Sequence, residues 1–360
     1  MRFWLISPPF IVLISGLTGF LVSRILYASH TPAHTQYLVG LFLFVLMYVY
    51  IAGLNAINVR LQPRKTNFIF SPEKYVINLY WVIGVFGFIT SIVLVITRGY
   101  FGDGAILFNL RYSHTNLKLP DYNIGLMSLF PALLSVYYIT KGNKKKALIA
   151  LALATLSSIA VAERTGLLFK FVAFGYAGMA SGHLNYRHAA IFILLFIMLA
   201  IGIAFGAGKL GSTGSEYFLL KYLGYGISSF NHWIAGSSPN GCEAKVLGEI
   251  IGGIFELLSG KVCDSPAGAP VGQFNVYTYM GAPYSFGGAM AVFLSMAFLG
   301  LAYAVIFRAA RKVMYFALFA PFLVYPLVMV FYAWQFTLNT FIYLAILAVP
   351  LSIQIRINRK

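Results

Sequence analysis

The stretch 159-IAVAERTGLLFKFVAFG-175 decides how this chain is folded. It lies inside residues 147–180, a run dominated by apolar side chains, and yet it contains Glu163, Arg164 and Lys170. An ionised side chain costs several kcal/mol in hydrocarbon unless it is paired or reached by water. Because 147–180 is too long for one membrane crossing of roughly 20 residues, we interpret Glu163-Arg164 as the exposed turn between two helices. Lys170 falls about two turns into the second helix, and the turn does not explain it.

The composition of the whole chain predicts an integral membrane protein. Of 360 residues, 60 % are hydrophobic and 10 % charged, with a mean hydropathy of +0.81, whereas a soluble domain carries about 25 % charged residues. We expect one all-α polytopic membrane domain over residues 1–360. A window of roughly 20 residues predicts about ten transmembrane helices, over 4–27, 35–56, 75–97, 122–140, 147–162, 165–181, 189–207, 284–307, 314–332 and 338–355. The first lacks a small-residue cleavage site, so we expect it to be retained.

The net charge of +17 indicates topology rather than binding to nucleic acid. The basic residues are unevenly distributed between the two sides. Every second connection, together with the two ends of the chain, holds 16 of the 26 basic residues, from Arg2 to Lys360, but only one of the nine acidic residues. The local charge is therefore +15 on one side and +2 on the other, which is the positive-inside pattern. The pattern predicts that both termini are cytoplasmic and that residues 98–121 and 208–283 lie on the outer side.

The outer segment 208–283 is the largest connection in the chain. Loops of that length are usually functional or disordered, and the apolar periodicity of 245-KVLGEIIGGIFELLS-259 predicts an amphipathic helix. Both cysteines, Cys242 and Cys263, fall in this loop, and on an oxidising face we expect them to form a disulfide. Their Cα atoms must then approach within about 7 Å, so we expect the helix to bend at Gly252-Gly253. A structural metal needs four ligands, and we predict none here.

Five cations oppose the positive-inside tendency because they fall on the predicted outer side: Arg98, Arg111, Arg164, Lys170 and Lys209. Guanidinium groups match phosphate oxygens bidentately and remain charged at low dielectric, so the set favours a phosphate ligand at the membrane surface. Alternatively, each cation extends to the headgroups or pairs locally, as Arg164 does with Glu163. Lys170 points some 120° away from Arg164 at about 100° per residue; it is a second contact or a helix–helix hydrogen-bond donor.

Motifs of soluble enzymes do not explain the chain. The segment 206-GAGKLGS-212 fails as a phosphate loop, because Ile203 replaces the first glycine and Leu210 replaces the Ser/Thr after the lysine. His30 and His34 have i, i+4 spacing, but Pro32 between them predicts polar loop histidines rather than a metal-binding helix face.

The segment 275-NVYTYMGAPYSFGG-288 resembles the signature of the Wzy-type O-antigen polymerases, which are oligosaccharide repeat-unit polymerases. The matching residues, which lead from the large outer loop into a helix, are Asn275, Tyr277, Thr278, Pro283, Tyr284, Phe286 and Gly287. The step from Arg164 to Leu168 also resembles an arginine-containing helix start of that family. Where the family often has an acid before the aromatic–Gly step, this chain has Ser285, so no acidic role is placed there.

The resemblance implies a glycosyltransferase-C-like architecture and a metal-independent membrane glycosyltransferase without cofactors. Its substrate would be an oligosaccharide on undecaprenyl pyrophosphate, extended at the periplasmic face of the bacterial inner membrane, in contact with membrane lipids and with a chain-length regulator protein as a partner. Fixed cations would stabilise the leaving pyrophosphate, and His232 or Glu216 would serve as the base. An O-antigen ligase of the same superfamily and a lipid-linked oligosaccharide flippase remain as alternatives.

Overall fold

The computed structural model describes residues 6–27, 31–53, 74–100, 106–115, 123–160, 164–185, 187–188, 191, 198, 226–227, 230, 279–331 and 339–352. Within these ranges the regular elements are helices and no strand occurs, which confirms the all-α class. The helices of the first half are α1 (Pro8–Tyr27), α2 (Pro32–Ala52), α3 (Lys74–Leu94), η3 (Val95–Gly99), α4 (Ile106–Thr115), α5 (Ile124–Met127), α6 (Leu129–Thr140), α7 (Lys144–Ala160) and α8 (Arg164–Ala180). Those of the second half are α12 (Gly281–Ala309), α13 (Met314–Phe319), η5 (Ala320–Leu323), α14 (Val324–Val328) and α15 (Asn339–Ser352).

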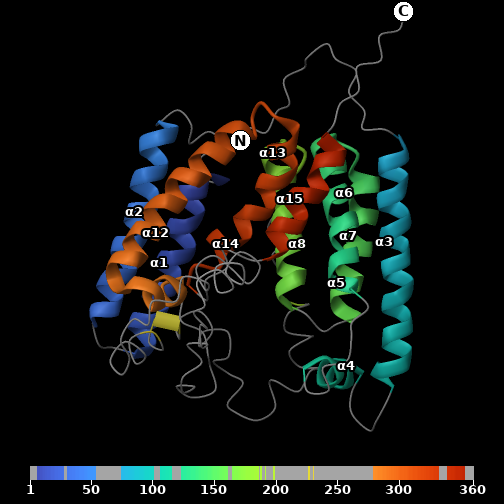
Figure 1. Ribbon diagram of the computed structural model, residues 1–360, viewed down its shortest axis with the longest axis horizontal. Helices are drawn as coiled ribbons and strands as arrows, with labels where there is room; N and C mark the ends of the chain where they lie inside the picture. The colour runs from blue at the N-terminus through green and yellow to red at the C-terminus, as the bar shows by residue number, and fades with distance from the viewer. Residues whose placement is uncertain are drawn as a thin grey trace, which may run out of the picture.

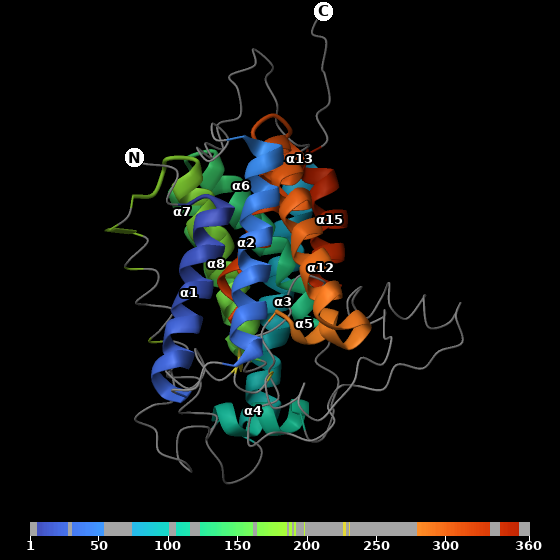
Figure 2. The same ribbon diagram turned by 90° about the vertical axis from the view of Figure 1, so that its left-hand side faces the viewer.

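The helices stand side by side in a bundle with two flanks (Figure 1). On one flank α2 packs along α12 and against α1; on the other, α6, α7 and α8 pack together with α3. The segment from α13 to α15 lies between them, where α14 contacts both α1 and α8. Figure 2 shows the flank of α1 and α2 facing the viewer, with α12 beside α2. The α6–α7 and α12–α13 turns, which carry lysine and arginine, lie at one end of the bundle, and α4 with the starts of α5 and α8 lies at the other.

The surface of the bundle is apolar where it faces outward, as expected for contact with lipid. On α3 the exposed residues include large apolar side chains at helical spacing: Leu79, Val82, Phe86, Ile89 and Val93. The opposite face of α3 buries Gly84, Gly87 and Ser91. Lipid is as apolar as these side chains, so close packing of small residues, rather than burial of large ones, holds such helices together.

The tightest crossing joins α2 to α12. A Cβ at Gly300 of α12 would clash with the carbonyl oxygen of Phe44 in α2. Further along, a Cβ at Gly40 would collide with the phenol of Tyr279, and the hydroxyl of Tyr279 donates to Tyr37 O at 2.5 Å. Gly300 therefore allows the backbones of two helices far apart in sequence to touch, and Gly40 makes room for the ring of Tyr279, just before α12.

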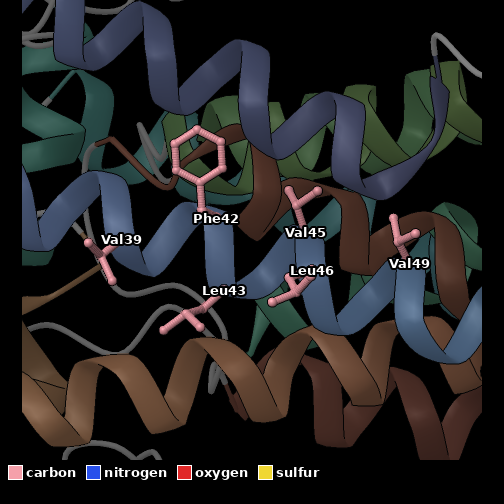
Figure 3. Close-up of a pocket in the computed structure, with 6 residues that line it drawn as sticks. All are labelled: Val39, Phe42, Leu43, Val45, Leu46 and Val49. Atoms are coloured by element: carbon pink, nitrogen blue, oxygen red, sulfur yellow. The ribbon is translucent and has the colours of Figure 1, made fainter.

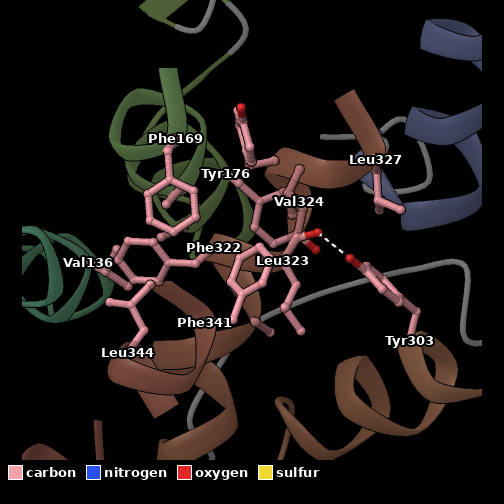
Figure 4. Close-up of a cluster of buried hydrophobic side chains, with 14 of the residues drawn as sticks. Val136, Phe169, Tyr176, Tyr303, Phe322, Leu323, Val324, Leu327, Phe341 and Leu344 are labelled. Carbon is pink, nitrogen blue, oxygen red and sulfur yellow. Dashed lines mark hydrogen bonds between the residues drawn. The ribbon is translucent and has the colours of Figure 1, made fainter. Parts of the chain in front are cut away.

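Side-chain hydroxyls tie the central segment to its neighbours. Ser15 Oγ donates to Leu327 O at 2.6 Å, and Tyr303 Oη donates to Leu323 O at 2.8 Å (Figure 4). Tyr80 Oη reaches Leu347 O at 2.6 Å. In hydrocarbon such donors have no water to bond, so each bond both satisfies a hydroxyl and fixes a helix.

Two helices depart from the uninterrupted spans that the apolar runs predict. The predicted span 314–332 is divided into α13, η5 and α14 because Pro321 and Pro326 remove backbone donors. Helix α12 is broken at Gly287 (φ −151°, ψ 31°) and Gly288 (φ 64°, ψ −154°). The conformation of Gly288 is accessible almost only to glycine.

In the part of the chain that the structure describes, four helices are long and apolar enough to cross a membrane: Pro8–Ile25, Pro32–Ala52, Lys74–Gly99 and Gly287–Ala309. Shorter apolar helices cover 124–140, 166–180, 314–328 and 340–352. These positions agree with the predicted spans, but the seventh span (189–207) and most of the 208–283 loop lie outside the described residues. The number of ten spans therefore stays a prediction.

One prediction about a single residue was wrong. His34 is not in a polar loop: it occupies the first turn of α2 and is buried. Its Nδ1 lies 2.8 Å from Thr31 Oγ1 and its Nε2 lies 3.2 Å from Ser23 Oγ. Pro32 does not break this helix because it stands at the start, where its missing N–H is not needed.

Candidate functional site

A pocket of about 240 Å³ opens between α5, α6, α8, α14 and α15. Its polar lining residues include Lys170, Ser128 and Thr340. The remaining lining residues are apolar, aromatic or glycine: Gly125, Leu126, Leu129, Gly166, Phe169, Tyr325 and Tyr343. The pocket thus combines one cation and two aliphatic hydroxyls with a mostly apolar wall, inside the part of the bundle that the membrane would cover.

Lys170 is only 4 % exposed and donates to oxygen acceptors on neighbouring elements. Its Nζ donates to Ser128 Oγ at 2.7 Å, to Ala154 O at 3.0 Å and to Ser158 Oγ in a shorter contact. Ser128 Oγ gives its own proton to Gly125 O at 2.6 Å, so it accepts from Nζ. Three oxygen atoms thus surround Nζ, a number that matches the three donors of an ammonium group. Lys170 therefore has the helix–helix donor role, and it also faces the pocket.

The sequence contains a signal for these partners that the analysis of motifs missed. Lys170 follows the first residue of α8 by six positions, and Ala154 precedes the last residue of α7 by six. Antiparallel helices joined by a short turn place such residues at the same depth. Ser158 lies one turn from Ala154 on the same face of α7. When a lysine occurs in an apolar helix, its hydrogen-bond acceptors can therefore be sought on the preceding helix, at the same number of residues from the connecting turn.

Aromatic rings form the wall next to Lys170. The ring of Phe169 lies 5.4 Å from that of Tyr325, in an edge-to-face arrangement, and 5.3 Å from that of Phe322. Phe341 completes this cluster at 5.7 Å from Phe169, and Figure 4 shows the rings converging between α8, η5 and α15. Because the cluster is buried on all sides, it holds α8 and therefore fixes the position of Lys170.

The predicted phosphate-binding arginines occupy elements that lie toward the same end of the bundle. Arg98 is half-buried in η3, Arg111 belongs to α4, and Arg164 is the first residue of α8. Helix α4 contacts η3, and Figure 1 shows both at the end where α8 begins. Lys170 lies six residues further along α8, about 9 Å deeper at 1.5 Å per residue. Lys209, the fifth predicted cation, lies outside the described residues.

Of the segment that resembles the polymerase signature, the structure describes the helical part. Tyr284 lies in the first turn of α12 with its ring 5.2 Å from that of Phe230, which belongs to the first third of the 208–283 segment. The helix break at Gly287-Gly288 follows directly. Asn275, Tyr277 and Thr278 lie outside the described residues.

The other predicted site residues also lie outside the described part of the chain. They are the candidate bases His232 and Glu216 and the cysteines Cys242 and Cys263, together with the Gly252-Gly253 bend. Among the residues that are described, no group of three or more His, Cys, Asp or Glu side chains is placed to hold a metal ion.

A larger hollow of about 490 Å³ on α2 does not offer the same chemistry. It is lined by the apolar side chains Val39, Phe42, Leu43, Val45, Leu46 and Val49, which project from one helix (Figure 3). Phe42 and Leu46 are about 60 % exposed, as expected for side chains that face lipid. No polar group lines this hollow, so the Lys170 pocket is the candidate site.

Comparison with known proteins identifies no relative: no protein-family model, no curated protein and no solved structure matches the chain. The class of protein therefore rests on the molecule itself. The described residues define an all-helical protein with several helices apolar and long enough to cross a membrane and a buried lysine in a pocket among them.

Proposed function

We propose that this protein is a membrane glycosyltransferase that polymerises lipid-linked oligosaccharide repeat units. In this proposal it works at the periplasmic face of the bacterial inner membrane, where it transfers the growing chain from undecaprenyl pyrophosphate to the next repeat unit. The resemblance of 275–288 to the polymerase signature suggests the reaction, and the arrangement of cations supports it.

The observation that carries the proposal is the position of Lys170. A lysine that is only 4 % exposed in an apolar helix costs free energy, because its charge is held away from water. Charged side chains inside a membrane usually face a cavity or a partner. Lys170 faces the pocket, on the helix that begins with Arg164 and at the end of the bundle that holds Arg98 and Arg111. A site with arginines at one end of the bundle and a lysine deeper along α8 suits a phosphate-bearing lipid that enters from the membrane.

The chemistry needs cations more than it needs a protein nucleophile. The acceptor hydroxyl oxygen attacks the anomeric carbon of the donor chain, the bond from that carbon to the pyrophosphate oxygen breaks, and the pyrophosphate leaves with the electron pair. Fixed cations stabilise the charge that develops on the leaving oxygen. The hydroxyl proton goes to a base, for which His232 and Glu216 are the candidates.

Purified protein incubated with lipid-linked repeat units tests the proposal. A polymerase produces a ladder of products that differ by one repeat unit. A ligase produces only single transfers when a core acceptor is added, and a flippase in vesicles moves the substrate across the membrane without making a glycosidic bond. Either of these results in place of the ladder would reject polymerisation.

The proposed topology predicts the behaviour of reporter fusions. Because 16 of the 26 basic residues collect on one side, we expect both termini and the α6–α7 turn to be cytoplasmic. A reporter active only in the periplasm should be silent after Lys360 and active when inserted near Gly236. Activity in the opposite pattern would place the predicted phosphate-binding arginines in the cytoplasm and contradict the proposed site.

A further inference from the structure

We propose that the Lys170 pocket binds the isoprenoid end of the carrier lipid: the phosphate joined to the isoprenoid and the first isoprene units, rather than any part of the sugar. The identity of the lipid rests on the proposed function. The chemistry, an anionic phosphate ester with an apolar tail, follows from the pocket.

The size of the pocket excludes the oligosaccharide. Pockets that enclose a drug-sized ligand have volumes of about 300–1,000 Å³, and this one has about 240 Å³. A repeat unit of several sugars does not fit. A phosphate group with a short length of hydrocarbon does.

The lining separates into a polar pole and an apolar wall. Lys170 and Ser128, joined by the 2.7 Å hydrogen bond, form the pole. Leu126, Phe169 and Tyr343 belong to the wall. Among the described residues, no Asp, Glu, Asn or Gln side chain lines the pocket, although a sugar with many hydroxyls would need such partners to satisfy its hydrogen bonds. An amphiphile with one anionic end matches this division.

The depth of Lys170 assigns it to the lipid side of the pyrophosphate. Arg164 stands at the start of α8, and Lys170 lies about 9 Å deeper. The bonds from Lys170 to Ala154 and Ser158 hold the ammonium at that depth, whereas an unrestrained lysine would extend toward the headgroups. The helix start at Arg164 therefore corresponds to the level of the outer, sugar-bearing phosphate, and Lys170 to the level of the inner one.

A phosphate can bind at the pole with as many hydrogen bonds formed as are broken. A phosphate oxygen replaces the Ser128 hydroxyl as an acceptor of the Lys170 ammonium, and the Ser128 proton turns from Gly125 O to the phosphate. The charge-assisted bond is the stronger one. Without ligand, Lys170 donates its hydrogen bonds to neutral oxygen atoms of the protein. When the lipid is bound, a phosphate oxygen replaces one of these acceptors.

Binding measured with purified full-length protein tests the inference, with four probes: undecaprenyl pyrophosphate, undecaprenyl phosphate, undecaprenol and inorganic pyrophosphate. The two phosphorylated lipids should bind at least tenfold more tightly than undecaprenol or inorganic pyrophosphate. Lys170→Met should weaken binding of the phosphorylated lipids by tenfold or more and leave binding of undecaprenol unchanged.

A second variant tests the apolar wall. Tyr343 is 41 % exposed, so its side chain can be removed without damage to the core, and Tyr343→Ala should weaken binding of all three lipids. Lys145→Met, an exposed lysine on α7, is the matched control and should bind every probe normally.

Each outcome decides the inference. It is overturned if Lys170→Met binds undecaprenyl phosphate like the unaltered protein, or if inorganic pyrophosphate competes as well as the lipids, which would make the pocket a site for free phosphate. Should Lys170→Met fail to fold, normal binding of the lipids by Tyr343→Ala overturns it. Lipid binding without a polymer ladder would reject the proposed function alone, and a ladder together with unchanged binding in Lys170→Met would reject the pocket assignment alone.

Discussion

Polymer should disappear when Arg164 is replaced by alanine, and it should disappear almost as completely when Arg164 is replaced by lysine. Arg164 is the first residue of α8, at the end of the bundle where η3 and α4 meet. A guanidinium binds two phosphate oxygens in parallel, whereas lysine offers a single point charge. Loss of one donor to a developing oxyanion typically lowers turnover by about 10²–10³-fold, and we expect losses of that size in both variants.

Chain-length ladders normalised for protein abundance in the membrane measure the effect. Arg187→Ala is the control, since Arg187 is exposed and lies on the predicted cytoplasmic side. Full-length polymer from Arg164→Ala would exclude a role in pyrophosphate binding and would leave the alternative, in which the side chain extends to the headgroups. Full activity in Arg164→Lys with none in Arg164→Ala would show that charge suffices and that bidentate geometry does not matter.

The largest effect on stability is expected for Gly300→Ala. The new Cβ would meet the carbonyl oxygen of Phe44, and this oxygen belongs to the backbone of α2, which cannot rotate out of the way as a side chain can. Helices α2 and α12 must then separate along their length. Overpacking of this kind costs about 1–3 kcal/mol, and the separation would also strain the bond between Tyr279 and Tyr37.

Gly175→Ala provides the matched control for this experiment. Gly175 lies inside α8 with no atom within 4 Å of an added Cβ, so alanine there should be neutral or should stabilise the helix by up to about 1 kcal/mol. Thermal unfolding in detergent compares the two variants. Equal unfolding temperatures for Gly300→Ala and the unaltered protein would contradict the close packing of α2 on α12.

Helix positions were predictable from the sequence because hydrocarbon imposes one rule on every crossing. The predicted spans 147–162 and 165–181 correspond to α7, which ends at Ala160, and to α8, which begins at Arg164. Arg164 therefore belongs to the helix and not to the predicted turn, and Glu163 lies outside the described residues. A long apolar run has to be a helix in a membrane, and a charged pair in its middle divides it.

The interior of the bundle could not be predicted in the same way. Pro321 and the pair Gly287-Gly288 interrupt helices that hydropathy treats as continuous, since hydropathy does not respond to backbone donors or dihedral angles. The partners of Lys170 were missed because a serine in an apolar run resembles any small residue. Its value as an acceptor appears only when the depths of two neighbouring helices are compared.

The bond from Tyr279 to Tyr37 O also has a consequence for biosynthesis, because it joins residues 242 positions apart. At a translation rate of about 5–20 residues per second, α2 waits about 12 to 48 s in the membrane before its partner has been made. During that interval the face of α2 around Gly40 is without α12 and borders lipid or the insertion machinery. The first hairpin of the protein is therefore a long-lived intermediate, and chaperones that shield unassembled helices have their longest opportunity to act on it.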